Sequence, residues 1–551
     1  MFYHGEAEVY TSVADLGQLL FTNLEIVRTL EHYLELEEDR LQKVRWLKTQ
    51  YENLYTTAIR DQESFLYNPV NAYLLVKRLT TDWETTGRLV DAAYSRGLIE
   101  NMNNEFLPFP DNEDLKGAAN ALLRLQDTYL LNSTKLAKGE IEGAKNVYTE
   151  FTAGDCFQLG QQAFNTKDNN HTIQWMQEAM VRLEEEVVKT ANYQAILEYQ
   201  ALATFRQGKK RRAIELVKEI LQMAPNHPRA HGYLAEYEKS LQNSGERSRE
   251  RSSEQNKVDY EYQEYYDYDY DSDSDESNAN TKSFSYTDED SRSLHSVKTA
   301  AIPSFKNYEK LCRGERIQSH LKESKLHCRY TTNNSKYLLL QPVKEEVLSL
   351  DPEILMYHDV ISDKDVELFR NISLPMLTRA NVINPVTGVQ EPATYRVSKS
   401  VWLKDKYHPR VKRASRIVQE VTGLSVDTAE ELHVINYGIG GHYEPHLDFK
   451  QENEADGFRH LGTGNRIATW IYYLSDVDAG GATVFPKIGV TVKPTKGSAA
   501  FWYNLKKSGK GDLNTIHAAC PVLVGSKWVG NKWLHEKDNE FRRPCSLNMY
   551  E

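Results

Sequence analysis

The residues with the clearest chemical meaning lie toward the end of the chain, around the stretch HYEPHLDF. His446 and Asp448 are separated by one residue of a predicted strand, so both side chains point to the same face. His517, at the start of another predicted strand, can supply a third ligand. Two histidines and one carboxylate leave three positions open on iron(II), two for a bidentate oxoacid and one for dioxygen. His442 shares the strand parity of His446 and is a rival ligand, ranked lower because Asp448 already completes the close pair.

Lys527 strengthens this interpretation. A His-x-Asp pattern alone is weak, because a chain with 16 histidines should contain about one by chance. Lys527 follows the Gly525-Ser526 turn, on the predicted strand after His517. A buried ammonium group is costly unless it is paired, and the distal carboxylate of 2-oxoglutarate is a suitable partner. We therefore expect His446, Asp448, His517 and Lys527 to form one catalytic site.

The region around these residues has the pattern of a β-domain. From about residue 340, short runs with period-two alternation, such as ELHVINYG and SAAFWYNL, are broken by Gly, Pro and Asp. This pattern predicts an antiparallel sandwich or jelly roll. We place this catalytic domain at 299–551, with its core at about 428–536.

The first half of the chain is predicted to be helical, which makes the whole an α+β multidomain protein. Residues 10–60 are typical of a long amphipathic helix, with apolar residues seven apart at Leu20, Val27, Leu34 and Leu41. We interpret 1–145 as a self-association domain. The alternative is a helix packed on the core of its own domain.

Residues 146–243 resemble tetratricopeptide hairpins, which bind extended peptides in a groove. The segment FQLGQQAF (157–164) opens one repeat, and Gly208, Ala213, Leu221 and Pro225 follow the expected order of another. Tyr199 and Arg229 are candidate peptide contacts, although most aromatic residues here can equally fill the repeat core. Residues 244–298 are expected to be a disordered linker, because their acidic run DYEYQEYYDYDYDSDSDESN lacks aliphatic residues.

Composition narrows the class of protein. A net charge of −12 argues against a general nucleic-acid binder, and no apolar run is long enough to span a membrane. The N-terminus lacks the pattern of a secretory signal. Five cysteines and sequons at Asn132, Asn170, Asn333 and Asn371 nevertheless favour a secretory route, with a signal peptide removed or missed. Closeness in sequence suggests pairs Cys312–Cys328 and Cys520–Cys545, although sequence cannot fix connectivity.

A family resemblance becomes clear at the motifs NYGIGGHYEPHLDF, LGTGNRIATWIYYLSDVDAGGATVFP, GSAAFWYNL and HAACPVLVGSKWVGNKWLHEKDNEFRRPC. They resemble the alpha subunit of collagen prolyl 4-hydroxylases, iron/2-oxoglutarate-dependent dioxygenases with a double-stranded β-helix. YEKLCRGE, ATYRVSKSVWL and TGLSVDTAEELHV extend the resemblance upstream, so that it covers about 300–551 strongly and the helical regions more loosely.

The resemblance implies C4 hydroxylation of prolyl residues in collagen-like X-Pro-Gly peptides. The reaction is coupled to oxidative decarboxylation of 2-oxoglutarate to succinate and carbon dioxide, as in a procollagen-proline 4-dioxygenase. The triad would bind Fe(II), and Lys527 would hold the C5 carboxylate of the cosubstrate. Tyr437 and Thr483 match cosubstrate-binding positions, and the positions that match peptide contacts are Tyr443, Arg466 and Trp533.

The same resemblance implies partners and a compartment. Members need O2 and L-ascorbate, and two alpha subunits assemble with two copies of protein disulfide isomerase in the endoplasmic reticulum lumen. Three alternatives stay open: a hydroxylase of another Pro-rich secreted protein, a related hydroxylase acting on lysine or on a regulatory protein, and a peptide-binding scaffold with an inactive dioxygenase domain. Lys527 argues against relatives that hold the cosubstrate with arginine, and the intact triad argues against the scaffold.

Overall fold

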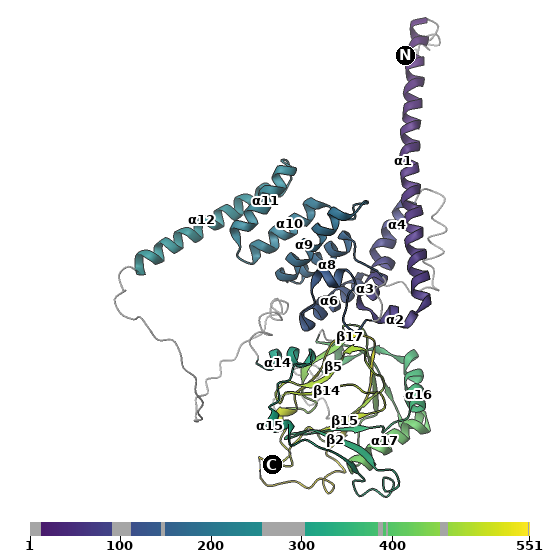
Figure 1. The fold of residues 1–551 in the computed structure, drawn as a ribbon, viewed down its shortest axis with the longest axis vertical. Coiled ribbons are helices and arrows are strands. Elements are labelled where there is room, and N and C mark those ends of the chain that lie inside the picture. Colours follow the sequence, from purple (N-terminus) through teal and green to yellow (C-terminus); the bar gives the residue numbers. More distant parts are fainter. Residues whose placement is uncertain are drawn as a thin grey trace, which may run out of the picture. The chain divides into compact units, whose positions relative to one another are not determined.

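A computed structural model describes residues 13–90, 112–144, 149–255, 303–383, 390–392, 395–451, 461–548 and 550–551. The chain forms two compact units, one of residues 1–66 and 73–115, the other of 67–72 and 116–551. The predicted fold class is confirmed, because helices precede an antiparallel β-domain (Figure 1).

The long N-terminal helix is confirmed as α1 (Val13–Arg60). Ion pairs one turn apart, such as Asp39 with Lys43, support its surface. Leu34 and Leu41, two of the apolar residues spaced seven apart, are 57% and 42% exposed. Both side chains are therefore available for contact with another copy, and self-association stays a prediction. The next elements are α2 (Gln62–Tyr67), α3 (Pro69–Lys77), the π-helix η1 (Arg78–Asp82) and α4 (Trp83–Val90).

In the described part of the chain seven helices follow, and from residue 116 onward they belong to the second unit. These are α6 (Asn112–Tyr129), α7 (Ser133–Ala137), α8 (Ala153–Asn165), α9 (Asn169–Glu185), α10 (Tyr193–Arg206), α11 (Lys210–Met223) and α12 (Ala230–Gln255). The hairpins α8/α9 and α10/α11 are the predicted repeats. Thr152 and Asp155 form a capping box that starts α8. A Cβ on Gly160 would lie 2.8 Å from Met176 Cε, so the glycine allows α8 and α9 to pack closely.

The expected linker lies mostly outside the described residues. Helix α12 continues to Gln255, past residue 244 where the linker was expected to begin, and residues 256–298 are not described.

The β-domain consists of two main antiparallel sheets. The nine-stranded sheet has the order β1 (Cys328–Thr331), β2 (Val343–Leu350), β3 (Glu353–His358), β15 (Ala499–Tyr503), β11 (Arg466–Tyr473), β18 (Lys527–His535), β9 (Leu432–Tyr437), β8 (Lys399–Leu403) and β4 (Thr378–Arg379). The five-stranded sheet has the order β14 (Val490–Val492), β13 (Thr483–Phe485), β16 (His517–Ala519), β10 (His442–His446) and β7 (Arg396–Val397). Two small pairs are β12 (Ala479–Gly480) with β17 (Val522–Val524), and β5 (Asn381–Ile383) with β6 (Gln390–Pro392).

The two sheets share one apolar core. Tyr437 and Trp502 from the larger sheet pack with Phe485 and Ala519 from the smaller one. On its other face the larger sheet is covered by α16 (Asp363–Ser373) and α17 (Pro409–Thr422), drawn along one side of the strands in Figure 1. Strand β18 is therefore buried at every residue, and a charged side chain on it has no access to solvent.

The suggested cysteine pairing is wrong. Cys312, at the end of α14 (Pro303–Cys312), is bonded to Cys520, while Cys328 and Cys545 are free and exposed. Tyr308 of α14 packs in an apolar cluster that also holds Cys520, so tertiary packing and not closeness in sequence decides the bond. Among the described residues, no helix is long and apolar enough to cross a bilayer.

Candidate active site

The three predicted iron ligands converge between the two sheets. His446 ends β10 and His517 begins the neighbouring β16, where the two residues pair across the ladder. Asp448 is not in a strand as expected but in a bend after β10. The bend still brings its carboxylate to both rings, with Oδ1 3.7 Å from His446 Nε2 and Oδ2 3.6 Å from His517 Nε2. The ligand atoms all lie within 4.8 Å of one another, whereas His442 is outside this cluster.

Backbone carbonyls orient both imidazoles. His446 Nδ1 lies 2.8 Å from the carbonyl oxygen of Glu444, and His517 Nδ1 lies 3.0 Å from that of Thr515. A carbonyl can only accept a hydrogen bond, so each Nδ1 carries the proton and each Nε2 presents a lone pair to the cluster. Thr469 donates to Asp448 Oδ2 at 2.7 Å and thereby fixes the carboxylate. Such supporting bonds hold metal ligands in place in known metal sites.

The electrostatics prepare the cluster for a cation. Burial alone would raise the pKa of Asp448, but the neighbouring His517, His446 and Arg466 lower it to about 2. Burial, followed by the proximity of His517, lowers the pKa of His446 to about 3. At neutral pH the site therefore offers an ionised carboxylate and a neutral imidazole, which are the forms that bind iron(II).

Lys527 lies in the same pocket, where none of the described residues gives it an acidic partner. Its side chain is 1% exposed, and its Nζ donates to Thr483 Oγ1 at 3.3 Å. Nζ also lies 5.6 Å from the centre of the Tyr437 ring. Burial lowers the pKa of Lys527 to about 7, and no carboxylate of the described residues opposes this shift. A buried amine without a counter-charge fits an anionic ligand, as the 2-oxoglutarate carboxylate would be.

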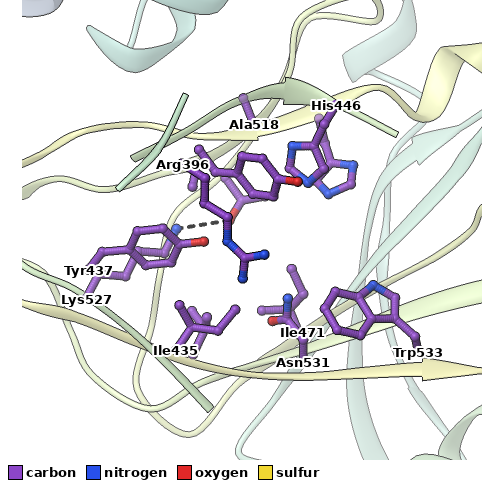
Figure 2. A pocket seen from close by; sticks show the side chains of 14 residues that line it. Arg396, Ile435, Tyr437, His446, Ile471, Ala518, Lys527, Asn531 and Trp533 are labelled. Atoms are coloured by element: carbon purple, nitrogen blue, oxygen red, sulfur yellow. Dashed lines mark hydrogen bonds between the residues drawn. The ribbon is translucent and has the colours of Figure 1, made fainter. Parts of the chain in front are cut away.

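The pocket also contains most of the other expected residues. Its lining includes Tyr437, Thr483, Tyr443 and Trp533 together with the two histidines and Lys527 (Figure 2). The Tyr443 ring stacks on His446 with centroids 3.5 Å apart. Burial raises the pKa of Tyr443 to about 12, so the phenol keeps its proton and can donate a hydrogen bond.

Arg466 is held away from the pocket lining. Its Nη2 donates to Glu430 Oε2 at 2.9 Å, and its guanidinium lies 3.9 Å from the centre of the Trp533 ring. Arg466 is therefore placed to fix the Trp533 indole rather than to carry a free positive charge into the cavity.

Sequence reasoning missed Arg396. Its guanidinium group points into the pocket (Figure 2), 5.0 Å from the centre of the Tyr443 ring. Nη1 donates to the carbonyl oxygen of Asn381, while Nε is buried with no hydrogen-bond partner among the described residues. The motif ATYRVSKSVWL contains this residue, and its strand parity alone could not tell an inward from an outward arginine. Thr469 was missed for a similar reason.

The two candidate peptide contacts lie in the repeat helices. Tyr199, on α10, packs edge-on against Phe157 and Phe164, with ring centroids 5.7 and 5.2 Å apart. Arg229, which precedes α12, is exposed, and its Nη2 lies 2.8 Å from Glu198 Oε2. Tyr199 is thus part of an aromatic cluster, whereas Arg229 presents most of its side chain to solvent.

Known proteins match the chain along nearly all of its length. Residues 432–535 match the model of the 2OG-Fe(II) oxygenase superfamily, so fold and site together define an oxygenase of this class. Residues 12–143 match the prolyl 4-hydroxylase alpha-subunit N-terminal region, and 153–243 match the prolyl 4-hydroxylase peptide-substrate-binding domain.

Relatives at full length identify the family. Prolyl 4-hydroxylase subunit alpha-1 of Homo sapiens is 42% identical over 98% of this chain and 96% of its own. Subunit alpha-2 of Caenorhabditis elegans is 40% identical over 98% of this chain and 94% of its own. The chain belongs to the prolyl 4-hydroxylase alpha-subunit family, and its resemblance to that family is confirmed. A solved structure of the viral collagen prolyl hydroxylase from Paramecium bursaria Chlorella virus 1 covers 33% of this chain and 94% of its own, with 22% identity and a TM-score of 0.27.

Proposed function

We propose that this prolyl 4-hydroxylase acts on collagen-like X-Pro-Gly peptides and uses iron(II), 2-oxoglutarate and dioxygen. The observation that carries the proposal is a single pocket that combines a His–Asp–His cluster with a buried lysine. The cluster fits a divalent metal with open positions, and the lysine fits a dicarboxylate. Collagen as the substrate comes from the family resemblance.

The residues divide the work as follows. His446, Asp448 and His517 would hold iron(II). The hydrogen bonds to the Nδ1 atoms of the two imidazoles and to the Asp448 carboxylate would orient these ligands. Lys527 would neutralise the distal carboxylate of 2-oxoglutarate, and Thr483 would add a hydroxyl from the neighbouring sheet. When bound, the metal and cosubstrate supply the oxidative decarboxylation to succinate and carbon dioxide that drives C–H hydroxylation. The apolar walls of the sandwich exclude water from this chemistry.

The peptide would enter beside Tyr443 and Trp533, whose rings line the same pocket. Tyr437 would contact the cosubstrate from β9. Arg396 would donate to a peptide carbonyl or to a cosubstrate oxygen, because its guanidinium lies inside the pocket. Arg466 would act indirectly by holding the Trp533 indole.

The repeat domain would bind the rest of the substrate, with Tyr199 and Arg229 among its contacts. The partners that the resemblance implies are protein disulfide isomerase in an assembly with two copies of each subunit, L-ascorbate, and a location in the endoplasmic reticulum lumen. The support is the match at full length to alpha subunits.

The test is decarboxylation of 2-oxoglutarate by the chain co-expressed with protein disulfide isomerase, with iron(II) and ascorbate. A (Pro-Pro-Gly) repeat peptide should stimulate turnover and gain about 16 Da per hydroxylated proline, an oxygen insertion. His446→Ala should abolish both effects. Turnover without peptide hydroxylation would reject the collagen assignment, and no turnover in a folded, iron-loaded complex would favour the inactive scaffold.

A further inference from the structure

Helix α6, which precedes the repeats in the sequence, contacts the ends of both histidine-bearing strands. Arg124 Nη1 donates to the carbonyl oxygen of Gly440 at 2.7 Å. Gly440 belongs to the loop that leads into β10, the strand that ends at His446. The Tyr129 hydroxyl donates to the carbonyl oxygen of Pro521 at 2.5 Å, and Pro521 follows the strand that begins at His517.

The contact is tight at the level of the backbone. Gly440 has φ +67°, and a Cβ there would lie 2.6 Å from Ala121 Cβ on α6. Gly480 has φ +76°, and its Cβ would lie 2.6 Å from the Tyr129 hydroxyl oxygen. Any side chain at either glycine would therefore push the helix away. Arg313 adds a third bond, from Nη1 to the carbonyl oxygen of Thr128 at 3.0 Å, beside the disulfide that holds Cys520.

The two strands are short, although each is paired on both sides within the five-stranded sheet. Strand β16 contains three residues and β10 contains five, and their pairing is interrupted by a register shift between Tyr443 and His446. Because short, irregular ladders hold position poorly, contacts at the strand ends should matter more than usual.

The opposite side of α6 is bonded to the repeat domain. Gln126 accepts from Trp175 Nε1 at 2.9 Å and donates to Gln174 Oε1 at 3.1 Å. Gln162 of α8 donates to Asn120 Oδ1 at 3.0 Å. Helix α6 is thus anchored on one side, which gives it the rigidity to hold the loops on the other.

We propose that Arg124 and Tyr129 are positioning residues of the iron site, through which α6 fixes the ends of β10 and β16 and so the spacing of His446 and His517. The inference rests on the proposed iron-binding role of the triad. It assigns neither residue a contact with substrate or metal.

The test is anaerobic titration of iron(II) into the assembled protein with 2-oxoglutarate, followed by the visible charge-transfer absorption of the chelate. Arg124→Ala should weaken apparent iron affinity about 10-fold, the lower end of the effect of residues that orient metal ligands. Tyr129→Phe, which loses one neutral hydrogen bond, should weaken it roughly 3-fold. Arg124→Lys keeps a cationic donor and should recover part of the loss.

The matched control is Arg182→Ala, because Arg182 also donates to a backbone carbonyl, that of Phe151, but within the repeat domain. It should leave the titration as in the parent protein. Parent-like iron affinity in Arg124→Ala, or an equal loss in Arg182→Ala, would refute the inference. If Arg124→Ala does not fold, a parent-like iron affinity of Tyr129→Phe would refute the inference instead. A parent protein that binds no iron would instead reject the proposed function, and the inference with it.

Discussion

Replacing Lys527 with methionine should stabilise the ligand-free protein and remove its response to 2-oxoglutarate. Methionine keeps the length of the apolar stem and deletes the charge. Burial lowers the pKa of Lys527 from 10.5 to about 7. At roughly 1.4 kcal/mol per pKa unit, keeping this lysine folded at pH 7 costs about 4 kcal/mol. The variant should gain a stabilisation of that order.

The sign of the pH dependence follows from the same shift. The folded-state pKa of Lys527 is below the unfolded-state value, so the unfolded chain binds more protons between about pH 7 and pH 10.5. The free energy of unfolding of the parent protein should therefore receive a contribution from Lys527 that increases from about pH 7 to pH 10.5. The variant lacks this contribution. The advantage of Lys527→Met should be largest at pH 7 and below and should shrink toward pH 10.5.

The assay is denaturant unfolding followed by tryptophan fluorescence, at pH 7 and pH 9, without ligand and then anaerobically with iron(II) and 2-oxoglutarate. At a ligand concentration 100 times the dissociation constant, the parent should gain about 2.7 kcal/mol from 2-oxoglutarate. The variant should gain almost none from it. Lower stability of the variant than of the parent at pH 7 without ligand would contradict the cost assigned to the buried ammonium group. An equal response of both proteins to 2-oxoglutarate would contradict the role of Lys527 in holding the cosubstrate.

Three further outcomes are expected. Asp448→Asn should lower iron affinity by at least about 100-fold in calorimetry, while His442→Gln, outside the cluster, should leave it unchanged. Glu430→Gln removes the counter-charge of the buried Arg466. Burial raises the pKa of Glu430, but Arg466 outweighs this effect and lowers the pKa from 4.5 to about 2. The variant should therefore lose roughly 3 kcal/mol of its free energy of unfolding. Because that stabilisation is complete above pH 4.5 and is lost only as pH falls toward 2, the deficit should be equal at pH 6 and pH 8 in denaturant titrations. Gly160→Val should overpack α8 against α9 and weaken peptide binding in a fluorescence assay, while peptide-free decarboxylation stays unchanged. Gly232→Ala is the control, because Gly232 has open space around it, and this variant should bind peptide like the parent.

Much of the site could be predicted because its chemistry is encoded locally. His446 and His517 were placed on predicted strands, and Lys527 follows a Gly-Ser turn on the strand after His517. The helical repeats were visible for the same reason, since Gly160 and Gly208 occupy positions that the hairpin geometry requires.

What could not be predicted depends on contacts between distant segments. Strand parity placed Asp448 in the ladder, but the chain bends after His446 and reaches the same point by a different route. Arg396 comes from an edge strand of the smaller sheet, and only the packing of that sheet turns it inward. The disulfide joins Cys312 to Cys520, 208 positions apart, which no spacing rule would select.

The position of α6 limits how the catalytic half can be used apart from the rest of the chain. A fragment beginning at Pro303 would keep every residue of the pocket but would uncover Gly440, Gly480 and the carbonyl of Pro521. A fusion of this oxygenase domain to another protein would need to include the α6 segment from Ala121 to Tyr129. Otherwise the surface that this segment covers would need to be redesigned. The oxygenase domain matches known proteins as a separate segment, but α6 covers part of its surface.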